Sequence, residues 1–333
     1  MSEAPVLEIR DLHVAFTAHG REIPAVRGVD LTIERGQTLA LLGESGSGKS
    51  VTAKAVMGLL DGPNVRVSSA AARLGGRDLT AMSAEERRAL RGSAMTLVFQ
   101  DALSALNPVL SVGDQVGELF RVHRGASRKQ ARARAVELLD LVGIPAAATR
   151  VGDYPHQFSG GMRQRILVAM AVALEPDLII ADEPTTALDV TVQAQILELI
   201  DRLRRELGTA VLLITHDLGV AAEVSDRVAV MYAGRIVESG EVGELYDLPA
   251  HPYTDALLAA IPDLDSPAAS LRAIPGAPPS PASVPPGCSF APRCARASEV
   301  CSTTRPELTL LPTGTGRYAA CHHSEEMLDA ARV

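Results

Sequence analysis

The sequence predicts an α/β fold around a mostly parallel β-sheet, and three observations support this. The apolar run Thr38–Leu42 ends directly in a glycine-rich loop, as a buried parallel strand does. Two more apolar runs, 178–181 and Ala210–Ile214, flank a helical pattern at 191–207. This alternation indicates parallel strands joined by crossover helices. The length of 333 residues suits about two domains.

The other expected elements follow from local patterns of apolar residues and helix-capping residues. The expected strands are 6–16 and 29–33, the expected helices are 51–60, 83–91, 127–142 and 161–174, and 228–238 is expected to be a terminal hairpin. Eight prolines fall in the 25 residues from Pro262 to Pro286. A regular helix or a central strand cannot hold so many prolines, so this segment is expected to be an extended connector.

Composition excludes several classes of protein. Hydrophobic residues make up 47% and charged residues 22%, which is ordinary for a globular chain and excludes an intrinsically disordered one. The net charge of −8 disfavours a nucleic-acid partner, since binding phosphates needs a basic face. No apolar run is long enough to span a bilayer, and the N-terminal residues lack the order of a signal peptide. A cytoplasmic protein is therefore expected.

A phosphate-binding loop is the strongest motif. It is Gly43-Glu44-Ser45-Gly46-Ser47-Gly48-Lys49-Ser50, which fits Gly-x4-Gly-Lys-Ser/Thr. Small residues let backbone N–H groups wrap a polyanion, and the following helix directs its positive N-terminus at the phosphates. Lys49 would reach the β- and γ-phosphates, and Ser50 would bind Mg²⁺. The alternative is a glycine loop without a ligand, which the strand before it and the helix after it disfavour.

Polar side chains follow three other apolar runs. Asp182 and Glu183 end the run at 178–181, where Asp182 would hold Mg²⁺ through water and Glu183 would deprotonate the attacking water. His216 follows Ala210–Ile214 and would sense the γ-phosphate. Gln100 follows an apolar run at 96–99 and would contact Mg²⁺ and the lytic water. Taken singly, His216 and Gln100 are more typical of ordinary surface residues.

Ser159-Gly160-Gly161 opens a helix and is a second possible phosphate site. In isolation, a Ser N-cap at an ordinary helix start is the better explanation. The order of the whole set decides between the two. The motifs and their order resemble those of the ATP-binding cassette ATPases. They are the phosphate loop, Gln100, Ser-Gly-Gly, Asp-Glu, Asp189 and His216.

Further segments resemble the ATPase subunits of the oligopeptide, dipeptide and nickel importers within that family. These segments are 99–108, 154–165, His251-Pro-Tyr-Thr254 and Pro286-Gly-Cys-Ser-Phe-Ala-Pro-Arg-Cys294. The resemblance covers nearly the whole chain. Met162 stands where the broad cassette signature has Gln, although Met is usual in this subfamily. Ala102 stands where relatives often have Pro, and neither departure removes a catalytic group.

The resemblance implies a P-loop NTPase (RecA-like) core with an N-terminal antiparallel β subdomain and an inserted α-helical subdomain. The ATP-binding domain would span 1–245, with the helical subdomain at about 103–175. A Pro/Cys-rich C-terminal extension would span 246–333. ATP would lie against Gly43 to Val51, with Phe16 stacked on adenine. Ser159, Gly160 and Gly161 would contact the γ-phosphate held by a partner ATPase, and Asp189 would lie at the dimer interface.

Four cysteines, Cys288, Cys294, Cys301 and Cys321, lie in the last 46 residues. In a reducing compartment such clustering favours metal binding over disulfides. Their spacing is looser than in zinc knuckles and suits a [4Fe-4S] cluster at least as well. Zinc and free thiols stay open, and His322 or His323 could replace one ligand.

The sequence therefore predicts an ATP-hydrolysing subunit of an ABC importer for dipeptides or oligopeptides, with ATP and Mg²⁺. Expected partners are a second ATPase subunit, preferably a paralogue, two membrane permeases and, indirectly, a solute-binding protein. The expected location is the cytoplasmic face of the cell membrane. Alternatives are a nickel importer ATPase and a soluble cassette ATPase without a transport function. A P-loop metabolite kinase would need neither Ser159 nor His216.

Overall fold

The computed structural model describes residues 4–99, 102–185, 188–260 and 273–330, and the chain divides into two compact units. Unit 1 comprises Met1–Leu7, Ile33–Gln37 and Arg73–Ile214. Unit 2 comprises Glu8–Thr32, Thr38–Ala72 and Thr215–Val333. Each unit therefore draws on segments that are far apart in the sequence.

Unit 1 is built on three parallel strands, as the alternating pattern predicted. They are β7 (Met95–Val98), β8 (Leu178–Asp182) and β9 (Ala210–Ile214), and β8 pairs with both of the others. Every residue of β8 and β9 is buried. Strands buried on both faces can be continuously apolar, which explains why these two lack polar alternation.

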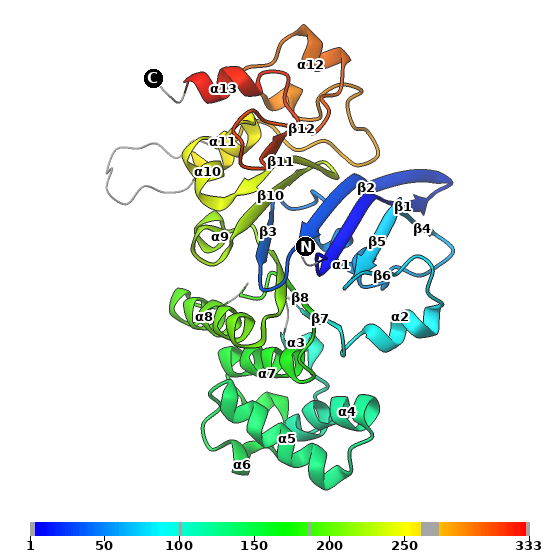
Figure 1. Ribbon diagram of the computed structural model, residues 1–333, viewed down its shortest axis with the longest axis vertical. Coiled ribbons are helices and arrows are strands. Elements are labelled where there is room, and N and C mark those ends of the chain that lie inside the picture. Colours follow the sequence, from blue (N-terminus) through cyan, green and yellow to red (C-terminus); the bar gives the residue numbers. More distant parts are fainter. Residues whose placement is uncertain (1–3, 100–101, 186–187, 261–272, 331–333) are drawn as a thin grey trace. The chain divides into compact units, whose positions relative to one another are not determined.

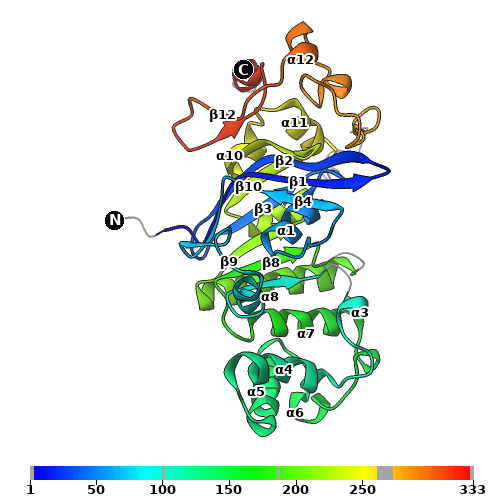
Figure 2. The same ribbon diagram turned by 90° about the vertical axis from the view of Figure 1, so that its right-hand side faces the viewer.

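The described helices of unit 1 are α2 (Ala84–Leu90), α3 (Ala102–Ala105), α4 (Val112–Arg124), α5 (Arg128–Leu141), α6 (Ala147–Arg150), α7 (Gly160–Val172) and α8 (Val190–Leu207), with a 3-10 turn η1 at Pro155–Gln157. Five of them, namely α2, α4, α5, α7 and α8, begin at a residue whose side chain caps the helix. Ser83 and Ser127 form the expected capping boxes with Glu86 and Gln130. Figures 1 and 2 show α4, α5 and α6 together on one side of α7, as an inserted helical group.

Unit 2 holds most of the other strands. β3 (Thr38–Leu42) runs parallel to β10 (Arg227–Tyr232), which forms a hairpin with β11 (Arg235–Glu241). The sequence predicted this hairpin as the end of the sheet, which is wrong. β13 (Tyr318–Ala319) pairs with β11, and β12 (Thr309–Leu310) pairs with β13. These two-residue strands are too short for a periodic pattern to reveal them.

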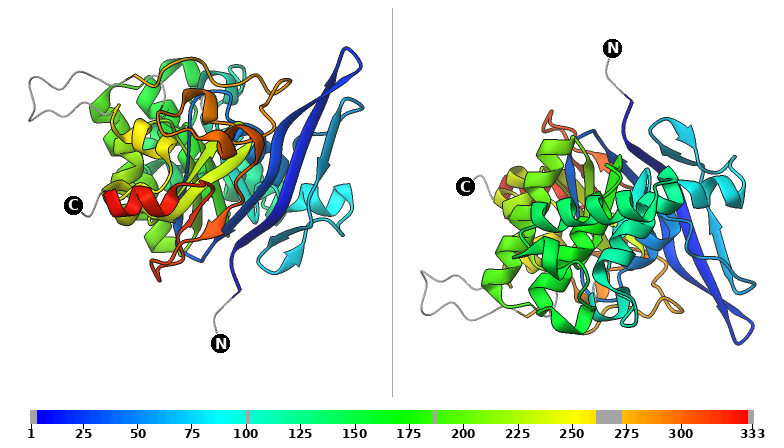
Figure 3. Two further views of the ribbon diagram at one scale, coloured as in Figure 1. Left: turned by 90° about the horizontal axis from the view of Figure 1, so that it is seen from above. Right: turned by 90° about the horizontal axis from the view of Figure 1, so that it is seen from below.

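The N-terminal strands are long and antiparallel. β1 (Leu7–Ala18) lies beside β2 (Arg21–Ile33) and pairs with β4 (Val65–Ser68), as Figure 3 shows. A short hairpin, β5 (Ala71–Leu74) with β6 (Arg77–Asp78), follows β4. The N-terminal antiparallel sheet that the sequence implied is thus confirmed.

Short helices complete unit 2. They are α1 (Lys49–Val56), α9 (Leu218–Val224), α10 (Val242–Asp247), α11 (Pro252–Leu258), α12 (Glu299–Thr303) and α13 (Ser324–Ala330), with a 3-10 turn η2 at Ala291–Arg293. α1 stops before residue 60, where the predicted helix ended. Of the predicted connector, 273–286 contains neither helix nor strand, and 262–272 lies outside the described residues.

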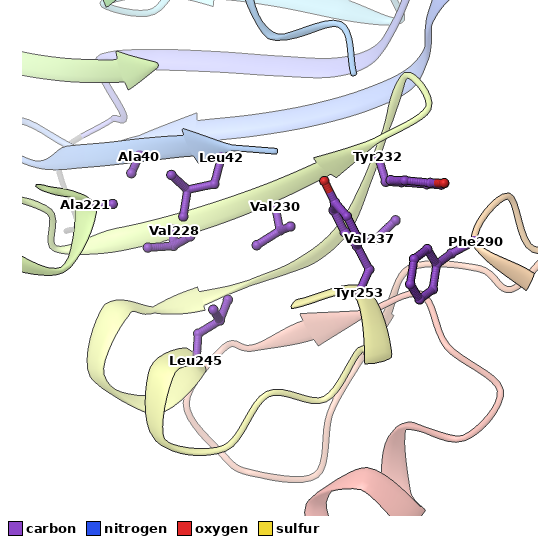
Figure 4. Close-up of a cluster of buried hydrophobic side chains, with 10 residues drawn as sticks. All are labelled: Ala40, Leu42, Ala221, Val228, Val230, Tyr232, Val237, Leu245, Tyr253 and Phe290. Atoms are coloured by element: carbon purple, nitrogen blue, oxygen red, sulfur yellow. The ribbon is translucent and has the colours of Figure 1, made fainter. Parts of the chain in front are cut away.

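An aromatic cluster joins the tail to the sheet of unit 2. The chain has only five Phe, five Tyr and no Trp. Tyr232 of β10, Tyr253 of α11 and Phe290 of the tail nevertheless meet in one core, with ring centroids 4.5 to 5.4 Å apart (Figure 4). Large rings bury much area per residue, so this cluster fixes a tail that is otherwise poor in apolar side chains.

A buried ion pair fixes the tail a second time. Arg317, just before β13, donates to the Glu238 carboxylate at 2.6 Å, and the two side chains are 2% and 0% exposed. Glu238 also accepts from the N–H groups of Ala250 and His251 at 2.8 and 3.0 Å. Burial raises the pKa of Glu238, while the bond from Arg317 acts to lower it. These bonds compensate a carboxylate that has no access to water.

None of the helices in the described ranges has both the length and the apolar character needed to cross a bilayer.

Removing one member of the buried pair should destabilise the protein strongly. Arg317→Met leaves the Glu238 carboxylate buried without its partner, so the free energy of unfolding should fall by about 3–5 kcal/mol. Adding Glu238→Gln should recover part of that loss. Arg305→Met is the matched control, because Arg305 and Glu307 form an exposed pair worth less than about 1 kcal/mol. Urea unfolding followed by circular dichroism measures the difference; equal losses in both Arg variants would contradict it.

Candidate functional site

The phosphate loop lies in unit 2 between β3 and α1, and two of its glycines are sterically required. Gly43 has φ 146° and a Cβ there would overlap the carbonyl oxygen of Met231. Gly48 has φ 110° and a Cβ there would lie 2.7 Å from the carbonyl oxygen of Ala25. Only glycine adopts these backbone angles without strain in so little space. The loop is therefore built to pack its backbone closely.

The N-terminus of α1 is open to an anion. Gly48 is its N-cap and provides no side-chain bond, and the first turn has no acidic residue. The Lys49 side chain is buried and donates to the carbonyl oxygens of Gly43 and Glu44 at 2.7 and 3.1 Å. The Ser47 hydroxyl is buried without a hydrogen-bond partner. Uncapped N–H groups, a lysine and a spare hydroxyl fit a polyphosphate.

Two more predicted residues lie in unit 2. Phe16 is half-buried in β1, opposite Val65 of β4. His216 is exposed and immediately follows Thr215, whose N–H donates to the carbonyl of Leu41 at 3.4 Å. His216 therefore lies at the end of β3 where the phosphate loop begins.

Asp182 and Glu183 lie in unit 1 at the carboxyl end of β8. Asp182 is 9% exposed and Glu183 is half-buried. The Glu183 backbone is left-handed, with φ 48°, and its N–H donates to the carbonyl of Ile214 at 2.8 Å. A non-glycine residue in this region costs about 1–3 kcal/mol and persists only where its surroundings hold it. The backbone of Glu183 is thus fixed rather than part of a free loop.

The structure brings the Ser159 loop and Asp189 together in unit 1. Ser159 caps α7 by accepting from Met162 N–H, and Asp189 caps α8 by accepting from Val192 N–H at 3.0 Å. A Cβ on Gly161 would lie 2.6 Å from Val192, so glycine is required where the two helices approach. Ser159, Gly160 and Asp189 are exposed. The N-termini of α7 and α8 therefore lie close together, with their capping residues exposed.

Arg150 supports this exposed surface, and no sequence motif had identified it. Its guanidinium lies 4.1 Å from the centroid of the Phe158 ring, donates to the carbonyl of Gln157 at 3.1 Å and pairs with Asp153 at 3.1 Å. It therefore fixes the turn before Ser159. A lone arginine in a loop has no periodicity or motif that would have identified it.

Gln100 lies outside the described residues, so nothing is added to its predicted role. The others fall into two sets. Phe16, the phosphate loop and His216 belong to unit 2; Ser159 to Gly161, Asp182, Glu183 and Asp189 belong to unit 1.

The four cysteines share one small pocket in unit 2, together with His251 and His323. The sulfur atoms of Cys294 and Cys321 accept backbone N–H groups at 3.4 and 3.3 Å. Within the part of the chain that the structure describes, no group of three or more His, Cys, Asp or Glu side chains is arranged to hold a metal ion, and all four thiols are free. The arrangement therefore does not provide the predicted cluster site as it stands.

The thiols differ in acidity. Burial raises the pKa of the Cys288 and Cys294 thiols, and it raises that of Cys321 to about 12. For Cys301 burial also opposes ionisation, but hydrogen bonds with Ser298 and His323 outweigh it and lower the pKa. Cys301 is thus the thiol that most readily becomes a thiolate.

Comparison with protein families gives two matches. A model described as ABC transporter matches residues 26–186. A second, described as the C-terminal region of oligopeptide/dipeptide transporters, matches residues 237–301. The first covers the phosphate loop, the Ser159 loop and the Asp-Glu pair. The second covers Tyr253 and Phe290 of the aromatic cluster and three of the cysteines.

Characterised relatives match over nearly the full length. The dipeptide transport ATP-binding protein DppD of Bacillus subtilis (strain 168) is 50% identical over 305 residues, which are 92% of this chain and 91% of that protein. The oligopeptide transport ATP-binding protein AppD of the same organism is 46% identical over 321 residues, 96% of this chain and 97% of that protein. A putative peptide import ATP-binding protein of Brucella abortus (strain 2308) is 50% identical over 96% of both chains.

Solved structures give the same result for the fold. The ATP-binding cassette MJ0796, solved as a dimer in a post-hydrolysis state with ADP and Pi, superimposes with a TM-score of 0.63. It is 27% identical and covers 71% of this chain and 98% of its own. The cbiO1 subunit of a Clostridium perfringens ABC transporter complex gives a TM-score of 0.60 at 26% identity, over 73% of this chain and 91% of its own.

The buried His251 should make stability fall in mild acid. Burial lowers its pKa from 6.5 to about 3, so the unfolded chain binds a proton that the folded chain does not. Stability is therefore lost as pH falls below about 6.5. Its Nδ1 accepts from Tyr253 N–H at 3.0 Å, a contact that asparagine can replace at a helix N-cap.

From pH 7.5 to 5, the wild type should lose on the order of 2 kcal/mol more unfolding free energy than His251→Asn. Urea unfolding at each pH measures this difference, and the carboxylates common to both proteins cancel. Parallel losses in the two proteins would show that His251 is not buried in its neutral form.

Proposed function

The chain belongs to the ATP-binding subunits of the oligopeptide and dipeptide ABC transporters, and on that premise we propose that it hydrolyses ATP to drive peptide uptake through separate membrane permeases. The observation that carries this is the 50% identity with a dipeptide transport ATP-binding protein over 92% of the chain. The sterically required glycines and open helix N-terminus of the phosphate loop support ATP as the substrate that powers it.

We propose the following roles for these residues in binding and hydrolysing ATP. The phosphate loop binds the triphosphate, with Lys49 on the β- and γ-phosphates and Ser50 as a ligand for Mg²⁺. Asp182 and Gln100 complete the metal's surroundings, and Glu183 accepts the proton of the attacking water. His216 is exposed and follows Thr215, whose N–H donates to Leu41 near the start of the phosphate loop, which supports His216 as the γ-phosphate sensor. Phe16 stacks on adenine.

The Ser159 loop completes the site of a second ATPase subunit. Ser159, Gly160 and Asp189 are exposed and form one surface, as a group that works across an interface requires. The dimeric solved structure of the cassette MJ0796 supports this assembly. We propose a paralogous ATPase as the partner, with two permeases and, indirectly, a solute-binding protein. The helical group at about 103–175 contacts the permeases at the cytoplasmic face of the membrane.

The domain boundaries that we propose rest on the same family resemblance. An ATP-binding domain at 1–245 and an extension at 246–333 are functional segments, whereas the two compact units are defined by packing. The match of the C-terminal family model from residue 237 supports a boundary near 245.

Glu183→Gln should abolish hydrolysis and leave ATP binding unchanged. The amide cannot accept the water's proton, so phosphate release by the complete transporter should fall at least about 100-fold. Lys49 and Ser50 are unaltered, so the dissociation constant for ATP should stay within about twofold of the wild type. Glu198→Gln, at an exposed position on α8, is the matched control and should keep full activity.

The same variant tests the shared site. With ATP bound but not hydrolysed, Glu183→Gln should accumulate as closed dimers in analytical ultracentrifugation. Adding Ser159→Arg should prevent this by steric and charge conflict. Wild-type turnover by Glu183→Gln would refute the assignment of the base, and dimers that survive Ser159→Arg would refute the shared site. Uptake assays with labelled peptide and with Ni²⁺ distinguish the peptide importer from the nickel alternative.

We further propose that the four-cysteine pocket takes up a metal, with a [4Fe-4S] cluster favoured over zinc. The shared pocket and the backbone N–H groups directed at two sulfurs support this, as does His251, whose buried Nε2 lacks a partner. The cluster would crosslink a tail that buries few apolar side chains. The thiols must move closer than they stand to hold it.

Protein purified without oxygen should be brown and carry about four irons per chain. Cys294→Ser should lower that iron content. Colourless protein with one zinc ion per chain would replace the cluster with the zinc alternative. If the protein contains neither iron nor zinc and four thiols titrate in the unfolded protein, the four cysteines are free thiols.

A further inference from the structure

The C-terminal extension reaches the phosphate loop through a single buried arginine. Arg293 lies in η2, immediately before Cys294, and its side chain is 4% exposed. Its guanidinium makes two bonds, of 2.6 and 3.0 Å, to the two carboxylate oxygens of Glu44. Glu44 is the second residue of the phosphate loop, 249 positions earlier in the sequence. A bidentate pair of this kind fixes direction as well as distance.

Both partners are held from other sides. Arg293 also donates to the carbonyl of Pro275 at 2.9 Å and to the hydroxyl of Tyr232 at 3.3 Å. The hydroxyl of Tyr253 accepts the backbone N–H of Glu44 at 2.9 Å. The extension thus binds Glu44 at its side chain through Arg293 and at its backbone through Tyr253.

Glu44 is the residue through which such a restraint would act on the loop. Its carbonyl oxygen accepts from the Lys49 ammonium at 3.1 Å and from the Ser47 N–H at 3.2 Å. A loop with three glycines loses much conformational freedom when it closes around phosphates. Holding Glu44 in place beforehand reduces the freedom still to be lost on binding.

The pair also solves an electrostatic problem. A carboxylate within a loop that wraps a triphosphate repels the ligand. The Arg293 guanidinium neutralises that carboxylate, and it keeps its own proton because Glu44 raises its pKa further. Glu44 can therefore serve as an anchor for the loop without opposing the nucleotide.

We propose that Arg293 is a positioning residue for nucleotide binding: the C-terminal extension clamps the phosphate loop through Arg293 and Glu44, so the order of the extension sets the affinity for ATP. This rests on the proposed function, since it assumes that the loop binds ATP. It assigns the extension a part in the ATPase cycle.

The test is the dissociation constant for a fluorescent ATP analogue, measured on the full chain well below its melting temperature. Arg293→Met removes the charge but keeps most of the stem, and should weaken binding roughly tenfold. Arg293→Lys keeps the charge but cannot make the bidentate contact, so its dissociation constant should lie between those of the wild type and Arg293→Met. Arg296→Met is the matched control, because Arg296 is exposed three residues further along the same segment.

Glu44→Gln removes the phosphate-loop partner of the ion pair and leaves the extension unchanged. It should also weaken binding, although less than Arg293→Met does, because it removes the carboxylate that repels the nucleotide. The double variant Glu44→Gln with Arg293→Met should be no weaker than Arg293→Met alone. This keeps the test decisive if Arg293→Met folds poorly. A dissociation constant for Glu44→Gln within twofold of the wild-type value would overturn the proposal. So would a double variant in which the two losses of binding free energy add up.

A second measurement exploits the reciprocity of linkage. If the extension strengthens nucleotide binding, nucleotide must stabilise the extension to the same degree. Adding ATP should therefore slow amide hydrogen exchange across 286–294 in the wild type and not in Glu44→Gln. Unchanged exchange in the wild type would overturn the proposal. Lys49→Ala separates the two hypotheses: undiminished ATP binding by that variant would refute the proposed function itself, whatever Arg293 does.

Discussion

A buried carboxylate, Glu238, is the constraint on which the C-terminal half of unit 2 depends. A charge with no exposed surface must be compensated by the protein itself, and here Arg317 and two backbone N–H groups do so. One of those N–H groups belongs to His251, which in turn caps α11 by accepting from Tyr253. The pairing therefore fixes both the tail that carries Arg317 and the helix that carries Tyr253.

Further contacts of Tyr253 connect this region to the phosphate loop. Tyr253 accepts the N–H of Glu44 and packs against Tyr232 and Phe290. Phe290 and Arg293 lie in one short tail segment, and Arg293 binds the Glu44 carboxylate. Buried hydrogen bonds thus connect the C-terminal extension to the phosphate loop, which begins at residue 43. In such a low-dielectric region each bond is stronger, and each missing partner costs more.

In unit 1 the backbone fixes the position of two of the groups proposed for chemistry. Glu183 is fixed by a left-handed backbone angle and a bond to Ile214, and Gly161 is fixed by the approach of Val192. Phosphoryl transfer depends on positioning and on charge stabilisation, so rigid backbone suits this task. The side chains proposed to act on ATP lie at strand ends and helix N-termini.

The sequence by itself determined the strands β3, β8 and β9, the capped helices α2, α5, α7 and α8, and the phosphate loop. These follow from patterns a few residues long, and local sterics and hydrogen bonding dictate them wherever they occur. It also predicted, through resemblance, which residues act on ATP. Only the tertiary structure decided that β12 and β13 extend the sheet, that the thiols stand apart from a metal geometry, and that Arg150 and Arg293 support two loops. Each of these depends on contacts between residues distant in sequence or on a single side chain without periodicity, so no local pattern encodes it.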